Sequence, residues 1–253
     1  MKSRLDGILF DLGDTILNFG KVDVKDLFEK GARRAYAYLD LIGQPVPPFA
    51  KFHRRQLWSI RWRYLVSHFT RREFNSLELM KSLARKMGQN LAPEQADELA
   101  WQWYEPLSEQ ATLDRGTRPL LEEWTAAGLK LGIVSNTFVP AVVLDRHLQQ
   151  HDLLEFFPVR IYSCDVGHRK PHRKIFRGAL KEAGLQADRT LFVGDSLRAD
   201  IDGANRAGLI PVWKSPQNES PGKSRPRYVI SELAQLRDVV AEFDTPSDSG
   251  EGN

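Results

Sequence analysis

Short apolar runs, each followed by a polar loop and then by a helical pattern, constrain the fold of this chain more than any other feature. Runs typical of buried strands occupy residues 8–10, 129–134, 158–163, 190–193 and 210–213, with helical patterns over 119–127, 139–150, 171–184 and 200–207. Strands that alternate with helices in this way predict an α/β fold with a parallel sheet and helices on both of its faces. We therefore expect a Rossmann-like core.

The segment from residue 20 to residue 114 interrupts this alternation. Its apolar residues recur at helical spacing, and no stretch alternates with the period of a strand. We interpret residues 20–114 as an inserted helical cap domain, and residues 1–19 and 115–243 as the α/β core domain. The polar residues 244–253 are predicted to form a disordered tail.

The composition narrows the classes of function. Because Cys164 is the one cysteine, the chain can form no internal disulfide and no cysteine zinc cluster, which fits a reducing cytoplasm. No apolar stretch approaches the roughly 20 residues of a membrane span, and Asp6 lies where a signal peptide would be apolar. The formal net charge of +3 gives no reason to expect nucleic acid as a partner. Monomer and homodimer both remain open.

Polar loops follow the predicted strands at residues 11–15, 135–137, 167–171 and 194–200. The carboxyl ends of parallel strands gather along one edge of a sheet, and ligands bind there. We therefore expect these four loops to form one site, although they are far apart in the sequence.

The residue types in these loops fit the binding of a metal ion and an anion. Asp11, Asp195 and Asp200 could hold Mg²⁺, which prefers carboxylates, waters and phosphate oxygens. Ser135 and Lys170 offer a hydroxyl donor and a positive charge to an anion. With a cation between the carboxylates, one of them can attack a phosphoryl group, and water then hydrolyses the aspartyl-phosphate.

These four loops, in this order, resemble the motifs of the haloacid dehalogenase-like (HAD) hydrolase superfamily. The most specific match is the run 193–196 followed by Asp200 and the stretch 204–208. The resemblance covers about residues 4–20 and 115–240, and the helical insertion lies where phosphatases of this superfamily carry a type-I cap. It implies an enzyme that hydrolyses phosphoric monoesters.

The resemblance also implies a role for each loop residue. It implies Asp11 as the nucleophile, with Ser135 and Lys170 holding the phosphoryl group. It also implies Mg²⁺ bound by Asp11, the carbonyl of Gly13 and Asp195, with Asp200 in support of this metal site. Asn136 is expected to bind the substrate as well. Ser135 and Lys170 would thereby take part in catalysis.

The first loop departs from the family pattern at Gly13. Family members usually have an acid at this place, which protonates the leaving group and later activates water. Here Asp14 follows one residue later. Asp14 is a candidate for that acid, with a cap residue or a metal-bound water as alternatives, and its other reading is a turn former or helix cap.

The function that these observations predict is a Mg²⁺-dependent phosphatase of a small phosphorylated metabolite. One alternative is a metal-free 2-haloacid dehalogenase that uses the same aspartate. Another is a non-catalytic binding protein of the same fold that lost the acid at Gly13. The basic, aromatic segment 51–64 of the cap is interpreted as a partly buried helix or as an anion-binding face over the site.

Overall fold

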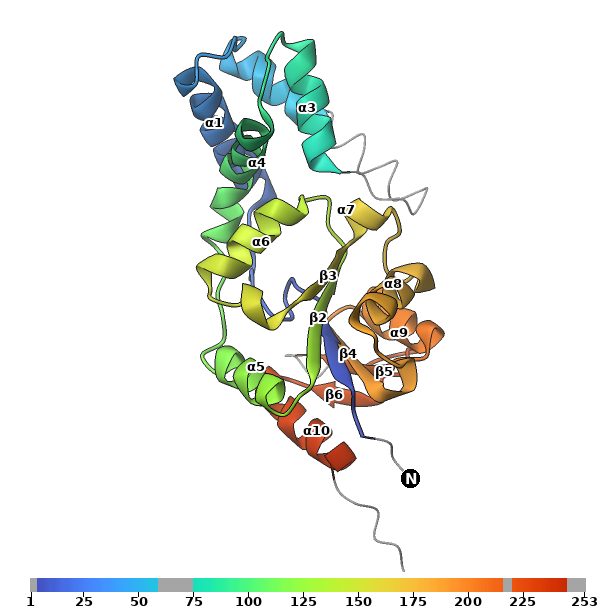
Figure 1. The fold of residues 1–253 in the computed structure, drawn as a ribbon. Helices are drawn as coiled ribbons and strands as arrows, with labels where there is room; N and C mark the ends of the chain where they lie inside the picture. Colours follow the sequence, from blue (N-terminus) through green and yellow to red (C-terminus); the bar gives the residue numbers. More distant parts are fainter. Residues whose placement is uncertain (1–3, 59–74, 216–219, 245–253) are drawn as a thin grey trace, which may run out of the picture.

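A six-stranded parallel sheet lies at the centre of the described part of the computed structural model, which comprises residues 4–58, 75–215 and 220–244 (Figure 1). Its strands run in the order β3-β2-β1-β4-β5-β6, and every neighbouring pair is parallel. They are β1 (Gly7–Phe10), β2 (Lys130–Ser135), β3 (Val159–Tyr162), β4 (Thr190–Gly194), β5 (Ile210–Lys214) and β6 (Tyr228–Ile230). The predicted α/β fold is confirmed.

Strand β1 occupies the middle of the sheet between β2 and β4, so its four residues are all buried and the run is apolar without alternation. Phe10 lies opposite Ile133 of β2 and Val193 of β4. The order of the strands reverses between β1 and β4, which is the switch point where open α/β sheets bind ligands. The loops that begin at Asp11, after β1, and at Asp195, after β4, therefore lie on the two sides of this crevice.

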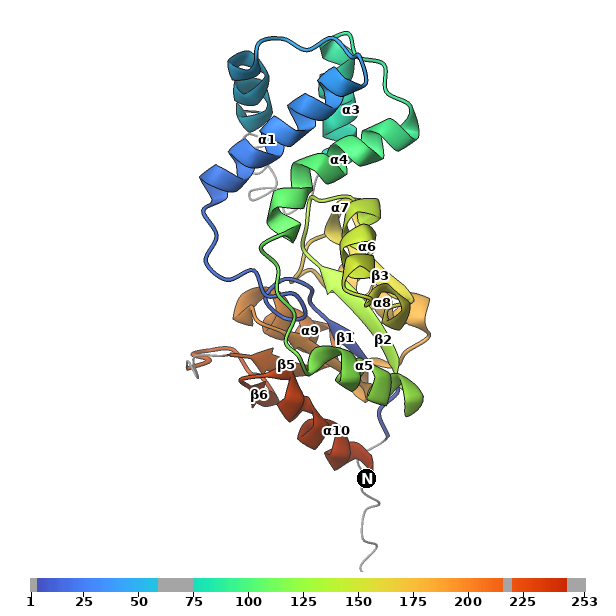
Figure 2. The ribbon, with the colours of Figure 1, turned by 90° about the vertical axis from the view of Figure 1, so that its left-hand side faces the viewer.

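Helices cover both faces of the sheet (Figures 1 and 2). One face carries α5 (Thr117–Ala126), α6 (Ala141–Gln150) and α10 (Leu236–Asp244), and the other carries α8 (Arg173–Ala183) and α9 (Asp202–Ala207). Ile8 and Phe10 of β1 pack into the first core, and Leu9 packs into the second, because side chains alternate along a strand. Shorter turns complete the core: η1 (Leu154–Phe156), α7 (Ser163–Val166), η2 (Ala187–Arg189), η3 (Leu197–Ile201) and η4 (Leu233–Gln235).

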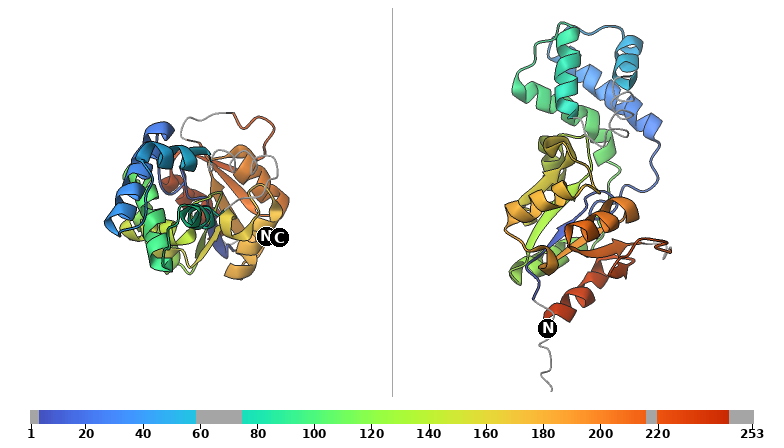
Figure 3. Two further views of the ribbon diagram at one scale, coloured as in Figure 1. Left: turned by 90° about the horizontal axis from the view of Figure 1, so that it is seen from above. Right: turned by 90° about the vertical axis from the view of Figure 1, so that its right-hand side faces the viewer.

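The inserted segment is helical and stands above the carboxyl edge of the sheet (Figures 1 and 3). It contains α1 (Val24–Leu41), α3 (Ser76–Lys86), α4 (Pro93–Ser108) and the helical residues 49–58. Helices α1 and α4 approach closely because Gly31 has no side chain, and a Cβ there would lie 2.3 Å from the carbonyl oxygen of Trp103. The predicted helical insertion after β1 is confirmed, whereas its boundaries as a domain stay a prediction.

Two predicted segments fall partly outside the description. Residues 59–64 of the basic, aromatic segment and residues 245–253 of the predicted tail lie outside the described residues. Within the described part of 51–64, Phe52 is fully buried whereas Trp58 is 70% exposed. No helix among the described residues is long and apolar enough to cross a membrane.

Polar contacts, one buried and one exposed, attach helix α4 of the insertion to α6 of the core. The hydroxyl of Tyr104 and Nδ1 of His147 are hydrogen-bonded at 2.9 Å. Arg146 stacks over Trp101, with its guanidinium carbon 4.1 Å from the ring centroid, and pairs with Glu98 at 2.6 Å. Burial, together with the charge of the neighbouring His151, lowers the pKa of His147 to about 4. The imidazole is therefore neutral in the folded protein near pH 7.

Candidate active site

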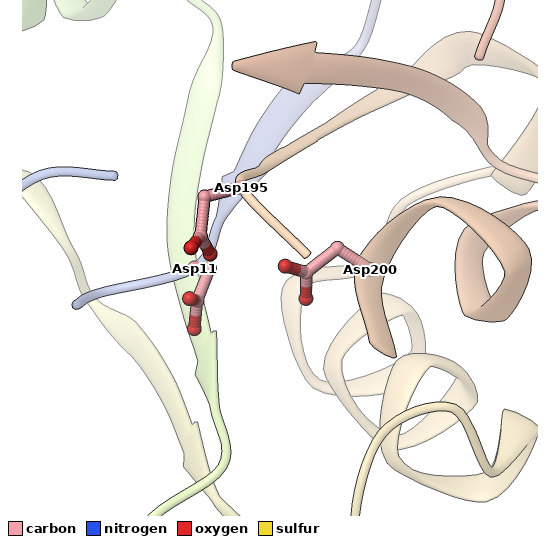
Figure 4. Close-up of side chains that lie close together, drawn as sticks. All are labelled: Asp11, Asp195 and Asp200. Carbon is pink, nitrogen blue, oxygen red and sulfur yellow. The ribbon is translucent and has the colours of Figure 1, made fainter. Parts of the chain in front are cut away.

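Three carboxylates meet at the carboxyl edge of the sheet. Asp11 follows β1, Asp195 follows β4, and Asp200 lies in η3, from which its side chain turns toward the other two (Figure 4). One oxygen from each carboxylate lies within 4.8 Å of the others. The structure therefore brings together the three acids that the sequence placed in separate loops, and they could hold a metal ion.

Lys170 joins this cluster from the loop after α7. Its Nζ donates a hydrogen bond of 2.6 Å to Oδ1 of Asp11 and forms an ion pair of 2.8 Å with Oδ1 of Asp200. The lysine side chain is 1% exposed, so burial alone would lower its pKa, but the two carboxylates outweigh burial and raise it. Lys170 therefore remains an ammonium, and it fixes one oxygen of Asp11.

The loop after β4 holds Asp200 at close quarters. Oδ2 of Asp200 accepts a hydrogen bond of 2.9 Å from the backbone N–H of Ser196. A Cβ at Gly194 would lie 2.4 Å from Cγ of Asp200, a distance that real Cβ atoms do not show. Glycine at the end of β4 is therefore required for the carboxylate to reach Lys170.

The cluster carries more negative than positive charge. Partial burial, together with the charges of Asp11 and Asp200, raises the pKa of Asp195 to about 7. Burial also raises the pKa of Asp200. Carboxylates whose protonation is favoured by mutual repulsion are the donors that a hard divalent cation would stabilise in their charged form. The donor set therefore fits Mg²⁺.

Asn136 and Ser135 come from the end of β2. The amide of Asn136 binds the backbone of Lys170 twice: its Nδ2 donates to the carbonyl oxygen at 3.0 Å and its Oδ1 accepts from the N–H at 2.7 Å. Asn136 thereby positions the lysine, and its predicted contact with substrate stays a prediction. Ser135 is buried and lines a cavity of about 340 Å³ together with Gly13.

The first loop gives Asp14 a structural partner. Its backbone has φ of 54°, in the left-handed region, and its Oδ1 accepts a hydrogen bond of 3.0 Å from the N–H of Phe19. Gly13 has no positive φ, and a Cβ there would meet only the Phe19 ring, at 3.6 Å. This geometry is typical of a turn former at Asp14. Its role as general acid stays a prediction.

Lys214 and Trp213, at the end of β5, also support the site, and neither is predicted from the sequence. Nζ of Lys214 donates to the carbonyl oxygens of Asp14 (3.1 Å) and Thr15 (3.0 Å) and to Oδ1 of Asn18 (3.1 Å), and the side chain is buried. Nε1 of Trp213 donates to the carbonyl oxygen of Asp195 at 2.8 Å. A lysine that directly follows an apolar strand was the available signal, because a charge there needs buried partners.

The parallel sheet carries a cluster of carboxylates at its switch point, bridged by a lysine, and a helical insertion follows its first strand. This arrangement is that of a hydrolase with an acidic site that could hold a metal ion. Residues 5–208 match the model of the haloacid dehalogenase-like hydrolases, and the chain belongs to this family. The predicted HAD-like hydrolase is therefore confirmed.

Related proteins include pyrimidine 5'-nucleotidases. The chain is 26% identical over 248 residues to PynA of Streptococcus pneumoniae, which covers 92% of this chain and 94% of that protein. It is 33% identical over 115 residues to YjjG of Escherichia coli, across 45% of this chain and 50% of that protein, so the match spans half of that relative's length. The structure of the HAD-hydrolase YfnB of Bacillus subtilis, solved with bound magnesium, has the same fold, with a TM-score of 0.58 at 24% identity over 94% of this chain and 99% of YfnB.

Proposed function

We propose that this protein is a Mg²⁺-dependent phosphatase that hydrolyses phosphoric monoesters of small metabolites, with Asp11 as the nucleophile. The observation that carries the proposal is the buried ammonium of Lys170 between Asp11 and Asp200, with Asp195 beside them. Lys170 orients one carboxylate oxygen of Asp11 and leaves the other free to attack. The same ammonium offers its charge to the oxygens of a phosphoryl group.

The carboxylates of Asp11, Asp195 and Asp200 and the carbonyl of Gly13 would hold the metal ion. When bound, Mg²⁺ neutralises charge on the phosphoryl oxygens and orients the group for in-line attack. This donor set fits because burial, together with the charges of Asp11 and Asp200, raises the pKa of Asp195, and a bound cation would stabilise its charged form.

Hydrolysis then proceeds in two steps. In the first, an oxygen of Asp11 forms a bond to phosphorus while the ester oxygen leaves, and the product is an aspartyl-phosphate. In the second, water attacks phosphorus, Asp11 is released and inorganic phosphate forms. The hydroxyl of Ser135 donates a hydrogen bond to a phosphoryl oxygen. Asn136 holds the Lys170 loop in place through its two hydrogen bonds to the backbone of Lys170.

The substrate is proposed to be a small phosphorylated metabolite such as a nucleotide. Two relatives carry the name pyrimidine 5'-nucleotidase, which supports a monoester of this size. The helical insertion stands over the carboxyl edge of the sheet (Figure 2), so its residues are expected to select the leaving group.

Phosphate release from p-nitrophenyl phosphate tests the proposal. Release should require Mg²⁺ and stop when the metal is chelated. Asp11→Asn should abolish it, whereas Asp40→Asn, which removes an exposed acid at the end of α1, should not. Substantial turnover by Asp11→Asn would exclude Asp11 as the nucleophile.

Different results would support the two alternatives, a metal-free dehalogenase and a non-catalytic binding protein. Chloride release from a 2-chloro acid without added metal would identify a dehalogenase. No turnover across a panel of phosphorylated metabolites would favour a binding protein.

A further inference from the structure

A strongly basic cavity of about 570 Å³ adjoins the candidate active site. Among the described residues, four arginines line it: Arg169 from the loop before Lys170, Arg173 at the first position of α8, Arg198 in η3 and Arg206 in α9. Segments that are far apart in the sequence therefore direct guanidinium groups to one hollow. No carboxylate is among the described residues that line it.

Three of these arginines, Arg173, Arg198 and Arg206, lack the ion pairs that other arginines among the described residues have. Arg160 pairs with Asp145, and Arg237 pairs with Glu123. Arg173, Arg198 and Arg206 are exposed, and no ion pair joins any of the three to another described residue. Like charges that gather on one surface repel one another, and an anion between them relieves that repulsion.

The basic cavity is continuous with the site in sequence and in space. Asn136 and Arg169 line both this cavity and the neighbouring one that contains Gly13 and Ser135. Lys170, which binds Asp11, also lines the basic cavity. A small molecule whose phosphoryl group lies against Asp11 can therefore place another part of itself among the arginines.

The chemistry of the lining identifies the ligand group. Guanidinium forks bind phosphate oxygens in pairs, and several forks match a phosphate better than a single carboxylate. The volume is in the range of small-molecule sites. The described residues that line the cavity include no Phe, Tyr or Trp, so they offer none of the aromatic platforms that single-stranded nucleic acids use.

We propose that the basic cavity binds a second phosphate group of the substrate, so that the enzyme selects phosphoric monoesters that carry two phosphates. This inference depends on the proposed phosphatase function. The arginines act as specificity-determining residues, because they contact the phosphate that is not transferred.

A series of α,ω-alkanediol bisphosphates tests this inference, each compared with the hydroxy-monophosphate of the same chain length. For the wild-type enzyme, kcat/KM should favour the bisphosphate by about 10-fold or more at one chain length, mainly through KM, because each charge-assisted contact contributes about this factor. Arg198→Gln combined with Arg206→Gln should bring this ratio close to one. Arg177→Gln is the matched control, since it removes an exposed arginine of α8 outside the cavity and should preserve the ratio.

Three results would overturn the inference. One is a wild-type ratio near one at every chain length. Another is an equal fall in kcat/KM for both members of each pair in the double variant, which would indicate a general electrostatic effect. The third is a change in the turnover of p-nitrophenyl phosphate on addition of pyrophosphate, in an enzyme that shows no preference for bisphosphates. That result would indicate a site for a separate anion.

Calorimetric titration with pyrophosphate separates this inference from the proposed function. If p-nitrophenyl phosphate is not hydrolysed, the proposed function fails on its own. Pyrophosphate binding that is lost in Arg198→Gln/Arg206→Gln and retained in Arg177→Gln would still support a phosphate-binding cavity. Binding that is absent, or equal in both variants, would exclude it.

Discussion

Gly13→Asp should accelerate this enzyme, because the first loop has room for an acid that the chain lacks. A Cβ at Gly13 would lie 3.6 Å from Cε2 of Phe19, which is an ordinary van der Waals contact. The backbone there has no positive φ, so a side chain is not strained. The new carboxyl would adjoin the cavity of about 340 Å³ that also contains Ser135. The substitution therefore requires no rearrangement of the loop.

The size of the effect depends on the leaving group. A positioned general acid contributes about 10²–10⁴-fold to proton transfer. An alkyl phosphate needs a proton on its leaving oxygen, so kcat should rise about 100-fold, near the lower limit, because nothing in the chain yet orients the new carboxyl. The nearby carboxylates Asp11 and Asp195 would raise the pKa of the new acid, which helps it to hold a proton. With p-nitrophenyl phosphate, whose phenolate leaves without protonation, the rise should be only a few-fold.

Initial rates with both substrate types, at saturating Mg²⁺, measure this difference. Gly13→Asn is the matched control because it has the same size and no proton to give, and it should remain at the wild-type rate. Asp14→Asn keeps the acceptor for the N–H of Phe19 and should also change the rate little. If Asp14→Asn instead slowed alkyl phosphate hydrolysis by 100-fold or more, Asp14 would be the acid. A folded Gly13→Asp enzyme no faster than Gly13→Asn would refute the reasoning.

Three other substitutions test the supports of the site and of the insertion by urea unfolding. Gly194→Ala should lower the free energy of unfolding by about 1–3 kcal/mol and reduce turnover, because its Cβ displaces Asp200. An unchanged free energy of unfolding would contradict this. Gly178→Ala is the control, because a Cβ there meets no atom within 4 Å. Lys214→Met should cost about 1–3 kcal/mol, since three acceptors, one buried and two part-buried, lose the buried ammonium as their donor. An unchanged free energy of unfolding would mean that water replaces the ammonium. The pKa of His147 is about 4 against 6.5 for an ordinary histidine, so between these pH values the unfolded state binds a proton that the folded state does not, and the free energy of unfolding falls as the pH falls. From pH 7 to pH 5 the wild type should therefore lose about 2 kcal/mol more than His147→Asn. Equal losses would show that His147 is not the cause.

Much of the fold could be predicted because its determinants are local in the sequence. The run Gly7–Phe10 is apolar at every position, as a strand buried on both faces requires, and turns with glycine or proline separate it from its neighbours. Boundaries were less accurate. Helix α8 begins at Arg173 with His172 as its N-cap, whereas the pattern placed its start at 171. A cap formed by a histidine side chain is a weak signal, because serine, threonine, asparagine and aspartate are the usual caps.

The parts of the site that escaped prediction depend on contacts between distant residues. Lys214 is 200 residues away from Asp14, and only the packing of β5 beside β4 brings its ammonium under the first loop. The double hydrogen bond from Asn136 to the backbone of Lys170 is equally invisible in the sequence, where an amide after a strand is read as a ligand group. The arginines of the basic cavity were also not recognised as a group, because they are dispersed between residues 169 and 206.

The charges of the site and of the basic cavity form one arrangement. One ammonium against the carboxylates of Asp11, Asp195 and Asp200 leaves two negative charges in excess, which a divalent cation would balance. A phosphoric monoester dianion that enters afterwards meets a site without net charge, so the local charges of the carboxylate cluster offer it little long-range attraction. The four arginines at the adjoining cavity supply that attraction at the position where substrate approaches. Their removal should therefore weaken the capture of bisphosphates more than that of monophosphates, and more strongly at low ionic strength than at high ionic strength, because salt screens exposed charges.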